Sequence, residues 1–473
     1  MPTHLDDVHA ALNRTRVHEL VPVRDERDVT RTLHRAAREG RPVAISGGRG
    51  AMGGQQFATG GFQLDMRGFD AMLGLDTERG LATLQAGATW PDILRDLETA
   101  QLGREDRWTI RQKQTGADFF TIGGSVSANA HGRGLDLAPL VQDVESVALI
   151  DAAARRRVCS RERDPALLGR VVGGYGLHGV VTAVTLRLAR RHALERHVEL
   201  RDADGLSAAF EARIRAGYTF GDFQFSCASD DDDFLRRGVF SCYLPVAEPP
   251  GREPRHVLDA ATWHDLLLLA HVDKREAFRR YAEHYLRTDG QRYWSDEHQM
   301  SVYLPGYHRA IDHACGARHR GSEMITELYV PRARLETFLA LARDDLRARG
   351  ADVVYGTVRL IRADRETALP WAREDYACVI FNLHTEHTAA GVTRTKIQCR
   401  SLIDLALDLG GSFYLTYHPW ARRDQLLAAY PALPAVLAAR RAADPRGVLR
   451  SDWLGTIERV LAEAPEVGLA RAG

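Results

Sequence analysis

The sequence lacks the composition that marks several large classes of protein. It has 63 Lys and Arg against 63 Asp and Glu, so its formal net charge is zero. Without a basic excess, neither nucleic acid nor an anionic membrane is expected as a partner. The longest aliphatic run, residues 266–270, is far too short to cross a bilayer, so no membrane span is expected.

Cysteine is scarce, and its spacing indicates neither disulfides nor a metal site. The six cysteines show no CxxC pair, which favours reduced structural thiols. The acidic run 230–233 lacks the glycine and glutamate of a calcium loop, and His264 and His271 have no third ligand in the sequence nearby. Residues 1–14 lack the apolar core of a signal peptide. We therefore expect a cytoplasmic protein without a metal; the sequence does not indicate its oligomeric state.

Glycine, in contrast, is abundant and concentrated in a loop. In residues 41–56, RPVAISGGRGAMGGQQ, a short apolar strand at 43–45 leads into a run with five glycines. Glycine tolerates positive φ, so such a loop can turn its backbone N–H groups onto a diphosphate, although an ordinary turn is the alternative. A Rossmann site would need a helix after the loop, but residues 57–76 read as strand, turn and strand. The sequence therefore favours a phosphate-binding loop of another kind.

Two further glycine segments strengthen this interpretation. Residues 112–134, QKQTGADFFTIGGSVSANAHGRG, alternate glycine with small hydroxyl and amide side chains, and residues 173–179 read GGYGLHG. Before them, Asp25 is expected to cap a helix that ends at Gly40. Three glycine loops within about one domain's length indicate several walls of one large ligand site, in a chain long enough for two or three domains.

The second half of the chain reads as an antiparallel sheet with helices. Period-2 alternation predicts its strands and helical spacing predicts its helices. The predicted strands are 196–200, 218–227, 239–245, 323–330, 352–361 and 376–384, and the predicted helices are 205–215, 272–287, 332–349 and 399–409. Together with the first half, this pattern predicts an α+β fold.

The order of these motifs resembles a known family. The loop at 46–54, TIGGSVSANAHGRG at 121–134, GGYGLHGVVTAVTLRL at 173–188 and DPRGVLRSDW at 444–453 resemble the vanillyl-alcohol-oxidase (PCMH-type) FAD superfamily. The sequence is most like the L-gulonolactone and alditol oxidases and decaprenylphosphoryl-ribose oxidase. The resemblance implies a two-subdomain FAD-binding domain at 1–191, an α+β substrate (cap) domain with an antiparallel sheet at 192–440, and a segment at 441–473 that returns to the FAD domain.

The resemblance also implies which residues hold FAD. Many relatives carry a flavin-linking histidine at the position of Gly50, and the alternative cysteine route has no cysteine near 115–132. His131 is a residual candidate for attachment, with a packing role favoured, so non-covalent FAD is expected. The implied cofactor-binding residues are Gly47, Gly48, Arg49, Gly50, Ala51, Met52, Gln55, Thr115, Gly116, Thr121, Gly124, Ser127, Asn129, Gly132 and Val181.

Catalytic candidates come from polar side chains on predicted strands, because oxidation of a carbinol carbon needs a base for the O–H proton. By resemblance to the alditol oxidases, Glu327 and Arg359 would contact substrate and His384 lies on a strand that supplies a histidine. Relatives have a catalytic lysine where this chain has Tyr417 and His418, so Tyr417, His418 and His384 all stay open as the base.

The expected function is therefore FAD-dependent dehydrogenation of a CH–OH group on a sugar-like or polyol substrate, by hydride transfer to flavin N5. Oxygen or another acceptor would reoxidise the flavin. Three alternatives stay open: oxidation of a CH–NH group, a flavin-dependent transferase without net redox turnover, and a binding protein that has lost its cofactor.

Overall fold

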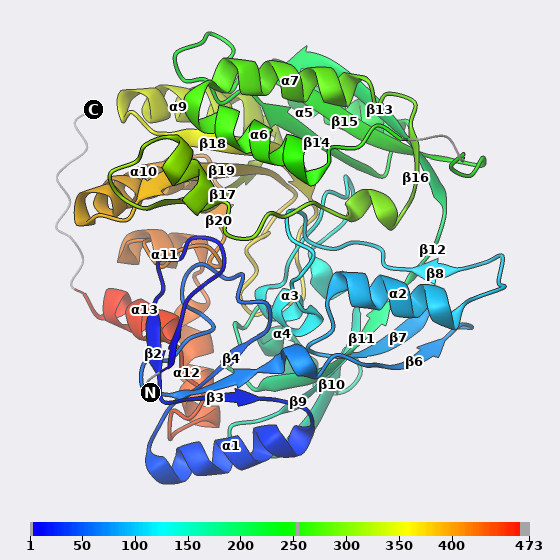
Figure 1. Cartoon of the computed structure of the whole chain (residues 1–473). Helices are drawn as coiled ribbons and strands as arrows, with labels where there is room; N and C mark the ends of the chain where they lie inside the picture. Colours follow the sequence, from blue (N-terminus) through cyan, green and yellow to red (C-terminus); the bar gives the residue numbers. More distant parts are fainter. Residues whose placement is uncertain (1–2, 252–254, 464–473) are drawn as a thin grey trace.

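The computed structural model describes residues 3–251 and 255–463 and shows two layers of structure (Figure 1). The N-terminal elements, in blue and cyan, lie on one side of the molecule, and a sheet with its helices, in green and yellow, lies on the other. We call this second part the cap. Helices in both parts and antiparallel strands confirm the expected α+β fold class.

The N-terminal part contains two main sheets. A parallel sheet has the order β3-β5-β4, and a five-stranded antiparallel sheet has the order β10-β9-β11-β7-β6. The elements are β1 (Thr3–Leu5), β2 (Thr15–Val17), β3 (Glu19–Pro22), α1 (Glu26–Glu39), β4 (Val43–Ser46), β5 (Phe62–Asp65), β6 (Met72–Asp76), β7 (Leu81–Gln85), α2 (Trp90–Ala100), β8 (Trp108–Thr109), α3 (Ile122–Ala128), β9 (Val144–Ile150), β10 (Arg156–Ser160), α4 (Pro165–Val171), β11 (Val180–Arg187) and β12 (Ala189–Arg190).

The cap is built on an eight-stranded antiparallel sheet, ordered β16-β13-β15-β14-β18-β19-β17-β20. Helices α9 and α10 contact β17, and α7 contacts β13 and β15. The elements are β13 (Ala193–Asp202), α5 (Leu206–Arg215), β14 (Phe220–Phe225), β15 (Arg237–Val246), α6 (Ala260–Val272), α7 (Lys274–Leu286), β16 (Arg292–Trp294), α8 (His308–Ala314), β17 (Gly321–Pro331), α9 (Leu335–Ala348), β18 (Val353–Ile361), β19 (Tyr376–Glu386), α10 (Ala389–Asp408) and β20 (Ser412–Phe413).

The chain then returns to the N-terminal part through α11 (Arg423–Ala429), α12 (Leu433–Ala443) and α13 (Asp452–Ala462), in orange and red (Figure 1). The Val43 N–H on β4 donates to the Val448 carbonyl at 2.7 Å, and the Asp452 carboxylate accepts from the Thr59 N–H at 3.0 Å. Residues 464–473 of the expected C-terminal segment lie outside the described residues.

Local signals locate several elements correctly. The Asp25 carboxylate caps α1 by accepting from the N–H groups of Arg27 and Asp28, and Gly40 ends the helix with φ of 63°, as expected from the sequence. Every predicted cap strand overlaps a strand of the structure. In the part of the chain that the structure describes, no helix has the length and apolarity that crossing a membrane requires.

Two predictions of local structure are wrong. Residues 122–128 were expected within a loop but form α3, because the helix is held by packing rather than by propensity. A Cβ on Gly123 would lie 2.9 Å from the Ala86 carbonyl oxygen, so glycine permits the close approach to β7. Helix α10 begins at Ala389, ten residues before its predicted start, because the Thr388 hydroxyl caps it and it packs on β17 and β19.

Candidate active site

One cavity lies where the glycine loop of the N-terminal part meets the cap sheet. Its walls come from the loop after β4, from the segment around α3, from the start of β11, and from β17, β18 and residues 414–417 of the cap. Expected cofactor residues that line it are Gly47, Gly48, Arg49, Gly50, Ala51, Gln55, Thr115, Thr121, Gly124, Ser127 and Val181. The three glycine segments therefore do share one cavity.

The glycine loop presents free hydrogen-bond donors to this cavity. Among the described residues, Gly47, Gly48 and Gly50 have no hydrogen-bond partner for their backbone N–H groups. Arg49, between them, has a left-handed φ of 57°. A left-handed residue within such a loop is a feature of backbone nests, which bind anions. These unpaired donors suit the diphosphate of a dinucleotide.

The loop also packs too closely on residues 119–121 to accept side chains. A Cβ on Gly48 would lie 2.6 Å from the Phe119 carbonyl oxygen, and a Cβ on Gly50 would overlap the Phe120 ring. The position at which relatives carry a linking histidine is thus filled by an aromatic ring from another segment. The wall also carries polar groups: the Thr115 hydroxyl is buried and has no hydrogen-bond partner in the described structure. The cradle fits FAD.

Four expected cofactor residues lie elsewhere. Met52 and Gly116 line a second cavity rather than this one. The Asn129 side chain is fully buried and structural, because its Nδ2 donates to Asp364 at 3.0 Å and its Oδ1 accepts from the Val141 N–H. Gly132 provides a close backbone crossing, since a Cβ there would lie 2.6 Å from the Lys113 carbonyl oxygen.

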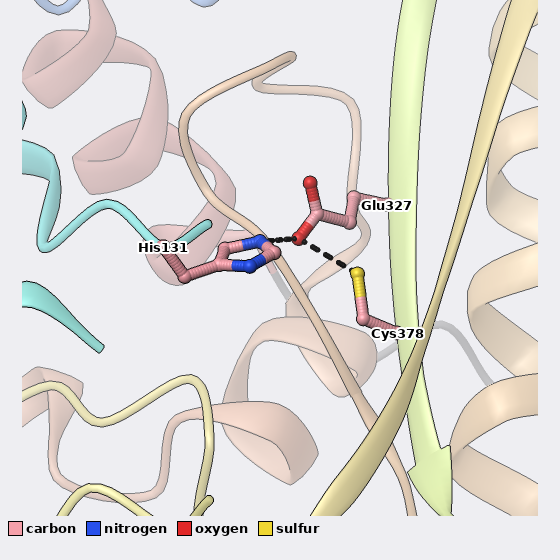
Figure 2. Close-up of side chains that lie close together, drawn as sticks. All are labelled: His131, Glu327 and Cys378. Atoms are coloured by element: carbon pink, nitrogen blue, oxygen red, sulfur yellow. Dashed lines mark hydrogen bonds and ion pairs between the residues drawn. The ribbon is translucent and has the colours of Figure 1, made fainter. Parts of the chain in front are cut away.

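At the cap end of the cavity, buried Glu327 collects four donors, and Figure 2 shows two of them, His131 and Cys378. Nε2 of His131 lies 2.6 Å from Oε1 of Glu327, and the Cys378 thiol donates to the same oxygen at 3.2 Å. The Tyr329 hydroxyl also donates to Oε1. On the other oxygen, Oε2, Glu327 accepts from the Tyr417 hydroxyl at 3.1 Å. These contacts fix the position of the carboxylate. Among the described residues, only Tyr417 bonds to its Oε2 atom.

The charges around Glu327 favour the ionised carboxylate. Burial alone would raise the pKa of Glu327, but the His131 imidazole and the Tyr329 hydroxyl outweigh it and lower the pKa to about 2. Burial and the charge of Glu327 raise the pKa of Tyr417 well above its ordinary value. Both ring nitrogens of His131 have a neighbouring oxygen, Glu327 Oε1 for Nε2 and the Gly132 carbonyl at 3.0 Å for Nδ1. Tyr417 is therefore a neutral hydroxyl beside an anion.

Arg359 on β18 is a buried cation of the site that has no partner among the described residues. It is 8% exposed, and within the described residues its guanidinium has no hydrogen bond and no ion pair. A buried cation without a partner is costly, so its position at the cavity wall points to an oxygen-rich ligand. Arg359 also lines a second cavity of about 710 Å³ under α6 and α7, which shares Gly50, Thr115, Phe120 and Tyr417 with the first.

Two of the expected base candidates, His418 and His384, do not line either of these two cavities. His418 lies on the opposite face of β17: its Nε2 is 3.2 Å from the Thr326 hydroxyl, its ring stacks on Trp420, and burial lowers its pKa to about 4. His384 lies on the cavity side of β19 but further along, where its Nδ1 is 3.5 Å from Glu323. Glu327, Arg359 and Tyr417 are the expected residues that the structure brings together.

Sequence reasoning missed the partners of Glu327. His131 was assigned a packing role, yet it contacts a carboxylate 196 residues away. Cys378, directly opposite Tyr329 on the neighbouring strand, gave no signal in the sequence. The polar alternation of Glu327 and Tyr329 on their strand was the signal that this face carries chemistry.

Comparison with known proteins agrees with this site. Residues 18–160 match the FAD binding domain family. An uncharacterized oxidoreductase from the fasciation locus of Rhodococcoides fascians is 29% identical over 49% of this chain and 53% of its own length. L-galactono-1,4-lactone dehydrogenase 1 of Oryza sativa subsp. japonica is 30% identical over 42% of this chain and 34% of its own, and cytokinin dehydrogenase 7 from the same organism is 29% identical over 34% and 31%.

The chain thus spans between about a third and about half of the length of these relatives. The matched residues include the glycine loop and α3, which line one side of the cavity. They also include strands β6, β7, β9 and β10 of the antiparallel sheet. Residues 18–160 thus form a domain of the FAD binding domain family, and through this domain the chain is similar to oxidoreductases and dehydrogenases.

Proposed function

We propose that this protein oxidises a CH–OH group of a sugar-like or polyol substrate. The observation that carries the proposal is the placement of Arg359 and the Tyr417–Glu327 pair on the wall of the cavity that holds the glycine loop. A guanidinium fork suits the paired oxygens of a hydroxylated substrate. The adjoining cavity of about 710 Å³ is in the range of pockets that enclose small organic ligands, about 300–1,000 Å³.

The residues suggest how the proton is handled. FAD, when bound, supplies a hydride acceptor. Arg359 orients substrate oxygens, and Tyr417 accepts a hydrogen bond from the reacting hydroxyl. As that hydroxyl loses its proton to the Tyr417 oxygen, Tyr417 passes its own proton to Oε2 of Glu327, 3.1 Å away. His131, Tyr329 and Cys378 hold the other oxygen, so the receiving oxygen keeps its direction.

We expect the FAD to be released when the protein is denatured by acid. Gly50 offers no side chain for attachment, and Phe120 occupies the space beside it. Precipitation of the purified yellow protein with acid should leave the flavin colour in the supernatant. A yellow pellet would show a covalent link and direct attention to His131, which lines the cavity.

Replacing Gly48 by alanine should weaken FAD binding. The new Cβ would lie 2.6 Å from the Phe119 carbonyl oxygen, and such overpacking costs about 1–3 kcal/mol, or about tenfold or more in Kd. Titration of deflavinated protein with FAD, followed by flavin fluorescence, measures the change. Gly74→Ala is the matched control, since nothing lies within 4 Å of its added Cβ. Equal Kd values for the two variants would argue against the assigned loop.

Anaerobic mixing with substrates tests the reaction. Candidate aldonolactones and polyols should bleach the flavin absorbance, and the oxidised carbon should appear as a carbonyl in the product. Bleaching by amines alone would assign the protein to CH–NH donors instead. Formation of a product without any bleaching would indicate a transferase, and a colourless protein that gains no thermal stability from FAD would contradict the cofactor itself.

A further inference from the structure

A cluster of histidines surrounds a second buried glutamate at the far end of the cap sheet. Glu323 on β17 lies directly opposite His384 on β19. His271, in the last turn of α6, and His308, at the start of α8, complete the cluster. In the sequence, no third ligand lies near His264 and His271. In the fold, Glu323 and His384 approach His271 from two strands, and His308 approaches from another helix. None of these four residues takes part in the proposed oxidation.

The distances from Glu323 to the two histidines are close to those between the ligands of a tetrahedral metal ion. Oε1 of Glu323 is 3.2 Å from Nε2 of His271 and 3.5 Å from Nδ1 of His384. The three ligand atoms lie within 4.8 Å of one another. In a zinc site with bonds of about 2.0–2.1 Å, the tetrahedral angle separates ligand atoms by about 3.3 Å.

The hydrogen bonding of the cluster is incomplete without an ion. The Nε2 atom of His271 and the Nδ1 atom of His384 are buried and have no hydrogen bond of acceptable geometry in the described structure. Both nitrogens nevertheless lie within 3.5 Å of one carboxylate oxygen, whose residue is 1% exposed. Buried polar atoms are normally paired, so this arrangement calls for a missing partner.

The surroundings orient the glutamate as they do in metal sites. Its second oxygen, Oε2, lies 2.7 Å from Nδ1 of His308 and accepts from the Tyr307 hydroxyl. Such contacts fix a ligating carboxylate from the outside. Gly321 makes room for the His384 ring, because a Cβ there would overlap it. The ligands thus come from elements that already hold them in place.

We propose that His271, Glu323 and His384 bind a zinc ion, with a water molecule in the fourth position. Two imidazoles and one carboxylate are ligands that Zn²⁺ accepts, in a three-ligand set with one open position. The ion joins the end of α6 to β17 and β19, and so ties the helices over the second cavity to the cap sheet. This site is independent of the proposed reaction at the flavin.

The test uses the FAD-loaded protein after dialysis against a chelator. Titration with ZnCl₂, followed by calorimetry and elemental analysis, should give one zinc per chain and a higher Tm. His384→Ala and Glu323→Gln should abolish this uptake, and His308→Ala should weaken it about 10–100-fold. His313→Ala, an exposed histidine on the same helix as His308, is the control and should bind as the wild type does.

Flavin absorbance in each variant shows that the protein has folded, and no substrate turnover is needed. Wild-type protein that takes up no zinc would overturn the proposal. Zinc uptake that is unchanged in His384→Ala would overturn it as well, as would binding of iron and not zinc. If Glu323→Gln loses its flavin, His271→Ala removes a ligand without changing the buried carboxylate and gives the same test.

Discussion

Glu327→Gln is expected to lower the rate of flavin reduction by substrate about 10²–10⁴-fold, the range for loss of a positioned acid or base. Glutamine keeps the shape of the side chain but cannot take up the proton that Tyr417 releases. The measurement is stopped-flow bleaching of the FAD absorbance under anaerobic conditions. Tyr417→Phe should produce a loss of similar size, because it removes the group between substrate and carboxylate.

Tyr329→Phe distinguishes proton transfer through Tyr417 and Glu327 from a merely structural effect on the site. The Tyr329 hydroxyl donates to Oε1 of Glu327 but lies outside the cavity lining, so its loss should cost far less. The Glu327→Gln substitution also removes the negative charge beside buried His131. The FAD content and the Tm of all variants must therefore be compared. Equal rates for wild type and a flavin-loaded Glu327→Gln would refute the relay.

Arg359→Ala is expected to reduce kcat/KM about a hundredfold, since charge-assisted hydrogen bonds contribute about 1.5–3 kcal/mol each. The guanidinium has no partner among the described side chains. Its removal should therefore affect the interaction with substrate rather than a contact within the protein. Arg359→Lys should recover little, because an ammonium lacks the fork that contacts two oxygens. Steady-state kinetics with the best substrate measures both variants.

Arg362 provides the matched control for Arg359. It follows the same strand and pairs with Asp136 and Asp375 away from the cavities. Arg362→Ala should leave kcat/KM unchanged within about twofold, as expected for an exposed ion pair. If both arginine variants lose activity equally, the effect is structural and Arg359 has no special role toward substrate.

Much of the fold could be read from local patterns. Helix α1 has an apolar stripe, a capping aspartate and a terminal glycine, and polar residues take every second position in the second half of β19. These signals act within a few residues, so they do not depend on distant partners. Helix α3 could not be predicted in this way, because its glycine-rich sequence favours a loop and its packing against β7 and β11 depends on the tertiary structure.

The sequence by itself determined the chemistry of the loop. Its glycines allow the backbone to turn N–H groups toward a ligand, and Gly50 offers no side chain for attachment of FAD. Only the tertiary structure decided which polar side chains meet there. Along β17, Thr326 and Glu327 point to opposite faces, and this one-residue step sends His418 against Thr326 and leaves Tyr417 with Glu327. His131 and Glu327 meet because the segment after α3 lies against β17 of the cap sheet, and no local pattern records that contact.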